Sequence, residues 1–107
     1  MECIRKLRKE EALPLQLLLL ADPSEQKVRE YCSEGDIYVA ELDKKIVGVY
    51  VLYELSRETV ELINIAVKES MQGKGIGKRL IEHSFSIAKS NGYNRIEVGT
   101  GNSSLDQ

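Results

Sequence analysis

The residues with the most chemical content form one short run, Gln72-Gly73-Lys74-Gly75-Ile76-Gly77-Lys78. An apolar strand pattern over residues 59–67 precedes this run, and a helical pattern follows it. Glycine lets a backbone approach a bulky ligand, and the first N–H groups of a helix, with the helix dipole, favour an anion. Lys74, Lys78 and Arg79 can add charge-assisted contacts to phosphate. The run therefore predicts a site for a phosphate-bearing cofactor.

Two common nucleotide-binding motifs do not fit this spacing. A P-loop requires a Ser or Thr after Gly-Lys to reach a magnesium ion, but Arg79 follows Lys78 here. A dinucleotide fingerprint requires glycine where Lys78 stands, and its glycine turn follows the strand directly, whereas several residues separate Val67 from Gly73. A plain strand-to-helix turn is the simpler alternative, but three glycines alternating with lysines and an isoleucine exceed what a turn needs.

The elements that must position this run are predicted from hydrophobic periodicity and turn residues. Predicted strands cover residues 3–8, 36–42, 45–55, 59–67 and 95–100; predicted helices cover residues 9–20, 22 to about 32 and 76 to about 91. Pro14 must lie near the start of the first helix, Asp22 is expected to be the N-cap of the second with Pro23 as its first residue, and Asp43-Lys44 is a hairpin turn. The order β-α-α-β-β-β-α-β predicts an α/β (α+β) domain with a mixed sheet.

Residues Gln72 to Gly77 fit the pattern Q/R-x-x-G-x-G/A and resemble the acetyl-CoA loop of the GNAT superfamily of N-acetyltransferases. Strand 63–67 before the loop, the helix after it and strand 95–100 follow in the family's order, so the resemblance covers roughly residues 1–104. It implies one domain over residues 1–107, with a mixed, mostly antiparallel sheet flanked by helices and without the family's last helix and strands.

The resemblance also implies an activity, namely direct transfer of an acetyl group from acetyl-CoA to a primary amine of a small molecule or peptide, without a metal. In the family the strands beside the loop splay apart, and the pantetheine arm pairs with free backbone groups of the first strand. The residues that would bind the cofactor are Ile65, Ala66, Val67, Gln72, Gly73, Lys74, Gly75, Ile76, Gly77, Lys78 and Asn102. Asn102 has an alternative role as a loop cap.

Glu61 is the predicted general base, at a position where several family members carry a glutamate. Strand alternation places Glu61 on one face with Ile63, Ile65 and Val67, so a β-bulge near Asn64 would be needed to turn it toward the cleft. A half-buried carboxylate there would have a raised pKa, which suits a base. The alternative, a solvent-facing strand residue, is equally open.

Composition excludes several other classes. The 107 residues are 42% apolar and 30% charged, with a net charge of −2, which gives no reason to expect nucleic acid or an anionic membrane as a partner. The apolar run at residues 17–21 is too short to cross a bilayer. Charged residues interrupt the first ten positions, so no apolar signal segment is expected there. Cys3 and Cys32 are interpreted as free thiols of a cytoplasmic protein, and the lone His83 is interpreted as a packing or surface residue that makes no zinc site.

The C-terminus departs from the family pattern. Family members usually continue after Asn102 with a helix, which carries a tyrosine that serves as general acid, and with two more strands. A truncated gene product, a fragment and a subunit completed by another chain all remain open. Strand 95–100 would then be an exposed edge, which predicts self-association or low stability. Two further hypotheses are a CoA-binding but catalytically weak module and an α/β interaction domain without a cofactor, the last disfavoured by Gln72 to Gly77.

Overall fold

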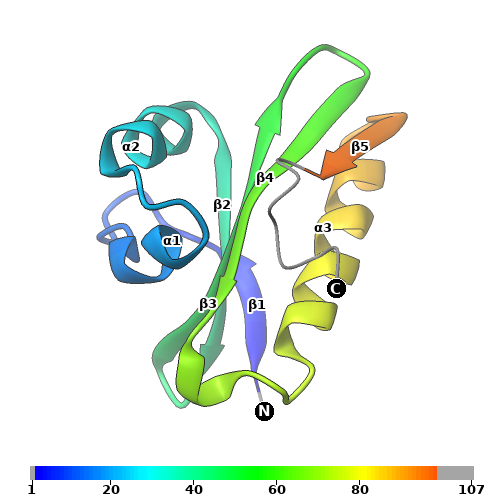
Figure 1. The fold of residues 1–107 in the computed structure, drawn as a ribbon. Coiled ribbons are helices and arrows are strands. Elements are labelled where there is room, and N and C mark those ends of the chain that lie inside the picture. The colour runs from blue at the N-terminus through cyan, green and yellow to red at the C-terminus, as the bar shows by residue number, and fades with distance from the viewer. Residues whose placement is uncertain (1, 99–107) are drawn as a thin grey trace.

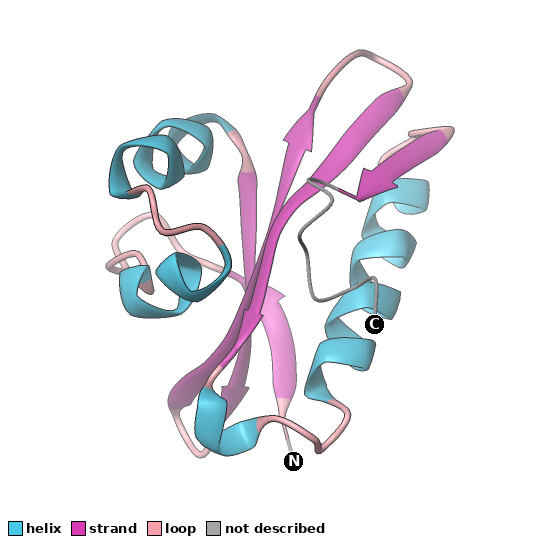
Figure 2. Ribbon diagram, in the orientation of Figure 1, coloured by secondary structure: helices cyan, strands magenta, loops and turns pink. Residues whose placement is uncertain are grey.

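The strands of the fold are β1 (Cys3–Lys6), β2 (Asp36–Leu42), β3 (Lys45–Glu54), β4 (Thr59–Val67) and β5 (Arg95–Val98), and the helices are α1 (Leu15–Ala21), α2 (Glu25–Glu34), α3 (Ile76–Ser90) and the 3₁₀ turn η1 (Glu69–Met71). The computed structural model describes residues 2–98. In these residues the five strands form one sheet in the order β1-β2-β3-β4-β5, antiparallel except for the parallel pair β4–β5. Helices α1 and α2 cover one face, and α3 covers the other (Figures 1 and 2). The predicted fold class is confirmed.

The hairpin of β2 and β3 forms where it is predicted. Its two turn residues, Asp43 and Lys44, have φ values of 53° and 67°. Two consecutive positive φ values are typical of the two-residue turn whose twist matches that of antiparallel strands. β2 and β4 have the predicted bounds, while the predicted end of β5, residues 99–100, lies outside the described residues.

The first helix is shorter than predicted, because it begins at Leu15 and not at Lys9. Proline disfavours helical geometry in the residue before it, here Leu13, and this excludes a helix that runs through residue 14. The Pro14 carbonyl instead accepts hydrogen bonds from the N–H groups of Leu17 and Leu18, both at 3.1 Å, so proline sits at the start of the helix.

The predicted N-cap of the second helix is wrong. Ser24 is the N-cap, and its Oγ accepts a hydrogen bond from the Lys27 N–H at 3.3 Å. Asp22 ends α1 instead, and its Oδ1 accepts from the Ser24 N–H at 3.1 Å. Pro23 therefore lies before the cap and not in the helix.

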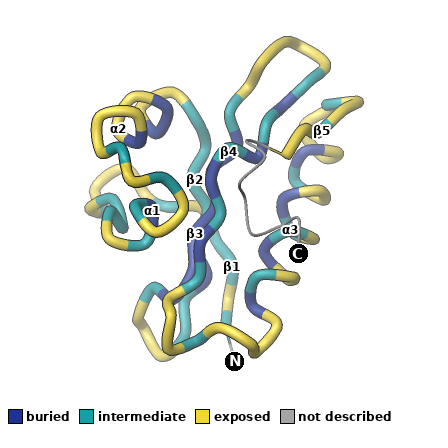
Figure 3. Tube along the Cα trace, viewed as in Figure 1, coloured by how far each residue is buried: buried dark blue, intermediate teal, exposed yellow. Residues whose placement is uncertain are grey.

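Two hydrophobic cores fill the two faces of the sheet (Figure 3). The core under α3 is built on buried residues of the sheet and helix: Ala40, Val47, Tyr50, Leu52, Val60, Leu62, Ile76, Leu80 and Ala88. The core under α1 and α2 is built on Leu18, Val28, Tyr31, Cys32, Val39, Val49, Val51 and Ala66. Because both faces are covered, the central strands β3 and β4 are held rigidly beside the glycine run.

The pairing of β4 with β3 contains a bulge. Val51 pairs with Asn64, whereas the next residue, Leu52, pairs with Leu62. Ile63 is therefore the extra residue, and the alternation of side chains along β4 is offset by one across it. The predicted bulge near Asn64 is confirmed.

Candidate acetyl-CoA site

The glycine run forms a tight connection between η1 and α3. Gln72 Nε2 donates a hydrogen bond to the Val67 carbonyl at 3.0 Å, which ties the start of the run to the end of β4. Gly73 and Gly75 have φ values of 81° and 85°, a region in which residues with a Cβ are strained. The two glycines thus let the chain reverse twice within four residues.

The N-terminus of α3 is open to an anion. Its N-cap is Gly75, which has no side chain to cap the helix, and the first turn contains no acidic residue. The first intrahelical bond runs from the Arg79 N–H to the Gly75 carbonyl at 3.1 Å. The N–H groups of residues 76–78 therefore have no acceptor within the helix, and together with the helix dipole they favour a phosphate.

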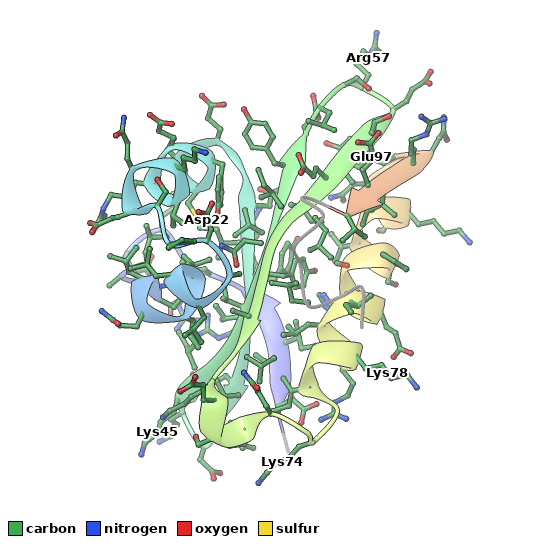
Figure 4. All side chains as sticks on the ribbon, viewed as in Figure 1. Asp22, Lys45, Arg57, Lys74, Lys78 and Glu97 are labelled. Atoms are coloured by element: carbon green, nitrogen blue, oxygen red, sulfur yellow. The ribbon has the colours of Figure 1, made fainter. Side chains whose placement is uncertain are left out.

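A cavity of about 240 Å³ lies where β4, the loop and α3 meet. It is lined by Ile65, Ala66, Val67, Met71, Gln72, Gly73, Ile76 and Gly77. The structure thus brings seven of the predicted cofactor residues together, and Met71 joins them although no sequence signal identified it. Lys74, Gly75 and Lys78 are exposed outside the lining, and Figure 4 shows Lys74 on the loop and Lys78 on the outer side of α3. Asn102 lies outside the described residues.

Within the described residues, strand β5 pairs with the first part of β4. The register joins Thr59–Leu62 to Arg95–Val98. Within residues 2–98, the backbone of residues 63–67 has no strand neighbour on that side. Apart from the Val67 carbonyl, which accepts from Gln72 Nε2, the outward N–H and C=O groups of Ile65–Val67 have no strand partner among the described residues, and an extended amide ligand could pair with them.

Glu61 lies on the other side of the bulge from Ile65 and Val67. Leu62 packs in the core under α3 before the bulge, and Ile65 and Val67 pack against that core after it, so Glu61 does not share their face. It is half-buried, opposite Tyr53 of β3 and Glu97 of β5. Burial, and second the charge of Glu97, raise the pKa of Glu61 above its ordinary value.

Asn64 anchors a buried polar network that the sequence analysis did not identify. Its side chain is 3% exposed, and its Nδ2 donates to the Leu18 carbonyl at 3.1 Å and to the Tyr31 hydroxyl at 2.8 Å. Tyr31 in turn donates to Asp22 Oδ2 at 3.2 Å. Because a carbonyl can only accept, Nδ2 must face Leu18, so Oδ1 is left without a hydrogen-bond partner among the described residues. The network fixes the connection between α1 and α2 against the bulged part of β4.

His83 also packs as predicted. Its Nδ1 lies 2.8 Å from the hydroxyl of Tyr50, a fully buried residue that stacks on Tyr38 with ring centroids 5.1 Å apart. Burial raises the pKa of Tyr50 and lowers that of His83, so the phenol donates to a neutral imidazole. These groups hold α3 on the sheet.

Other features are consistent with a site made of backbone groups. The described residues contain no cluster of His, Cys, Asp or Glu that could hold a metal ion. Both cysteines are free. No helix in the described part of the chain is long and apolar enough to cross a membrane.

A second cavity, of about 710 Å³, opens on the α1 side of the sheet between α1 and residues 68–70.

Known proteins are similar to this chain in sequence and in fold. The chain matches the acetyltransferase (GNAT) family over residues 4–106. The chain belongs to this family. Its GNAT relatives include an uncharacterised N-acetyltransferase, YvbK, of Bacillus subtilis (strain 168), which is 52% identical over 91 residues, 85% of this chain and 59% of that protein. The chain therefore spans about three fifths of the length of this curated relative.

Solved GNAT structures superpose closely. A GNAT family acetyltransferase from Elizabethkingia anophelis, crystallised with acetyl-CoA, matches with a TM-score of 0.93 and 40% identity, covering 99% of this chain and 69% of that one. An IAA acetyltransferase from Bacillus cereus ATCC 14579 matches with a TM-score of 0.91 and 50% identity, covering all of this chain and 71% of that one.

Proposed function

We propose that this chain binds acetyl-CoA and acts as an N-acetyltransferase on a primary amine of a small molecule or peptide. The observation that carries the proposal is the 240 Å³ cavity, where unpaired backbone of β4 meets a glycine turn and the uncapped N-terminus of α3. The relative from Elizabethkingia anophelis, which has the same fold over nearly all of this chain, holds acetyl-CoA.

The residues of the cavity fit this cofactor in two parts. The free N–H groups of residues 76–78 would bind the diphosphate, with Lys74 and Lys78 adding positive charge. The unpaired backbone at Ile65–Val67 would pair with the pantetheine amides. Acetyl-CoA supplies an activated thioester, and the N–H of Val67, which points away from β3, would polarise its carbonyl as oxyanion donors do.

Glu61 is the proposed general base, acting directly or through a water molecule. An amine is mostly protonated at neutral pH, so a carboxylate with a raised pKa assists the attack. The bulge at Ile63 and the half-burial of Glu61 support this role. Asn102 is proposed to contact the cofactor or the acceptor.

A second candidate function is that of a CoA-binding but catalytically weak module. None of the tyrosines, all of which lie in the described residues, lines the cavity. Four of their hydroxyls, those of Tyr31, Tyr50, Tyr53 and Tyr93, already have hydrogen-bond partners. No phenol of residues 2–98 is therefore placed in this cavity to protonate a leaving thiolate.

The cofactor site is tested by isothermal titration of the chain with acetyl-CoA, using Gly75→Asp and a matched control, Gly92→Asp. Both glycines have similar positive φ values, 85° and 91°, so both changes impose similar backbone strain. Only residue 75 lies at the N-terminus of α3, where a carboxylate would repel phosphate and occupy its place. We expect micromolar binding by the wild type and Gly92→Asp, and none by Gly75→Asp. Equal binding by the two variants would exclude this loop as the cofactor site.

Turnover separates the two candidate functions. Release of the CoA thiol is followed with a thiol-reactive dye in the presence of polyamines, amino acids, aminoglycosides or short peptides. Amine-dependent release that Glu61→Gln reduces supports the transferase. Tight binding without release supports the binding module. The free cysteines are in accord with a reducing cytoplasm, where we expect the protein to act.

We also propose that the chain self-associates through the outer edge of β5. In residues 2–98 this edge has no strand partner, and Val98 and Phe85 of α3 are 44% and 45% exposed. An open strand edge beside apolar side chains favours pairing with another strand. Sedimentation velocity should show dimers that Val98→Lys weakens. A monodisperse monomer with an ordinary cooperative melt would contradict this proposal.

A further inference from the structure

The side chain of Arg79 folds back over the glycine turn. Its Nη2 donates to the Lys74 carbonyl at 3.3 Å, while its backbone N–H bonds to the Gly75 carbonyl. A Cβ atom built on Gly75 would lie 3.0 Å from Nη1 of the same guanidinium. Arg79 therefore covers the Lys74–Gly75 peptide.

The Arg79 guanidinium is held there by Glu2, from the opposite end of the chain. Arg79 Nε donates to the Glu2 carboxylate, and the Glu2 side chain is only 14% exposed. The hydrogen bond from Arg79 is the main cause that lowers the pKa of Glu2, so the pair is ionised at neutral pH. Glu2 directly precedes β1, and Figure 1 shows the start of β1 near the loop that enters α3.

The charges around the N-terminus of α3 indicate what this contact does. A cation in the first turn of a helix opposes the helix dipole, and a nearby carboxylate offsets that cost. Glu2 neutralises Arg79 in this way. In contrast, Lys74 and Lys78 are exposed and form no ion pair with any described residue. Among the described residues, the cations of this loop and first turn without an ion-pair partner are thus the lysines and not the arginine.

We infer that Glu2 and Arg79 form a positioning pair that holds the Lys74–Gly75 turn in its ligand-ready shape, and that Arg79 does not itself contact the cofactor phosphates. This inference rests on the proposed function of the loop and assigns a role to the N-terminal segment ahead of β1. In the opposite arrangement, Glu2 would compete with phosphate for Arg79, and removal of the Glu2 charge would strengthen acetyl-CoA binding instead of weakening it.

Titration with acetyl-CoA at low and high salt distinguishes these arrangements. We expect Glu2→Gln to weaken binding about 2–5-fold, Arg79→Met to weaken it similarly, and the double variant to be no worse than either, because one interaction is lost in each case. The dependence of affinity on salt should not change in the double variant, which removes one charge of each sign, since neither group touches a phosphate. Glu25→Gln, which breaks the exposed ion pair with Arg29 on α2, is the control and should leave affinity unchanged.

Tighter binding by Glu2→Gln, or a weaker salt dependence in the double variant, would overturn the inference. Amide hydrogen exchange at Arg79, whose N–H bonds to the Gly75 carbonyl, gives a readout without ligand and should quicken in Glu2→Gln but not in Glu25→Gln. If the wild type binds no acetyl-CoA, the proposed function fails, and the positioning pair stands or falls on this exchange alone.

Discussion

Tyr31→Phe should destabilise the fold more than Asn64→Leu, although both remove the same hydrogen bond. The phenylalanine deletes an oxygen that accepts from Asn64 at 2.8 Å and donates to Asp22 at 3.2 Å. One Nδ2 hydrogen of Asn64 then stays buried without an acceptor, in a side chain that is 3% exposed. A buried unpaired donor costs about 1–3 kcal/mol, so we expect Tyr31→Phe to lower the free energy of unfolding by about that amount.

Asn64→Leu removes both donors but also removes the unpaired Oδ1. The Leu18 carbonyl keeps its bond from the Asp22 N–H at 3.1 Å, and the Tyr31 hydroxyl keeps Asp22. Losing two hydrogen bonds costs about 1–3 kcal/mol, and no longer burying an unpaired carbonyl returns about 1–3 kcal/mol. We expect Asn64→Leu, which is similar in volume, to lie within about 1 kcal/mol of the wild type.

Urea unfolding at pH 7, followed by circular dichroism, measures both variants. With a slope of about 1–3 kcal/mol per molar urea, Tyr31→Phe should shift the midpoint by roughly 1 M. Tyr93→Phe is the matched control, because its hydroxyl bonds Glu54 at the surface and its loss should cost under about 1 kcal/mol. The reasoning is wrong if Asn64→Leu is the more destabilised variant, since Oδ1 would then have to be paired.

Three further substitutions test the site and its surroundings. Glu61→Gln should raise the melting temperature at pH 7 while it lowers acetyl transfer: the raised pKa means that folding disfavours the charged form, a cost that is absent below the ordinary pKa of 4.5 and fully present above the folded-state pKa. Equal melting temperatures across that pH range would contradict it. Gly35→Ala should cost about 1–3 kcal/mol of unfolding free energy in thermal melts, because its Cβ would lie 2.7 Å from the Leu52 carbonyl oxygen, and a neutral result would refute this steric argument. Gly77→Ala should instead stabilise by about 0.5–1 kcal/mol and keep acetyl-CoA binding, because residue 77 is helical and its Cβ would meet only Val67 Cγ2, at 3.7 Å; loss of binding would show that the ligand needs this glycine.

The elements that the sequence predicts best are those with local causes. β2 and β4 have their predicted bounds because alternating apolar residues end at turn residues on both sides. The two helix starts fail for equally local reasons. Pro14 ends up at the start of α1, and Ser24 takes the capping role because Asp22 is engaged with Tyr31 and the Ser24 N–H.

The candidate site also has some features that could be predicted from the sequence and others that could not. The glycine turn could be predicted from Gly73 and Gly75, whose residue type reports the backbone conformation directly. Contacts between distant residues could not. Asn64 meets Leu18 across 46 positions and Tyr31 across 33, and Arg79 meets Glu2 across 77, and no periodicity encodes such pairs. The charge of Arg79 therefore predicted a phosphate ligand, whereas its guanidinium bonds to Glu2 and to the Lys74 carbonyl.

The bulge at Ile63 divides β4 into two parts, whose side chains alternate in opposite phase. Up to Leu62, β4 pairs with β5 and alternates so that Glu61 faces away from the core under α3. Beyond the bulge the alternation is reversed, so Ile65 and Val67 pack against that core, and within residues 2–98 their backbone has no strand on the side where β5 pairs with Thr59–Leu62. Without the extra residue, Glu61 would share a face with Ile65 and Val67, and its side chain would point toward the core under α3. A single inserted residue thus turns Glu61 to the face opposite the one on which Ile65 and Val67 pack.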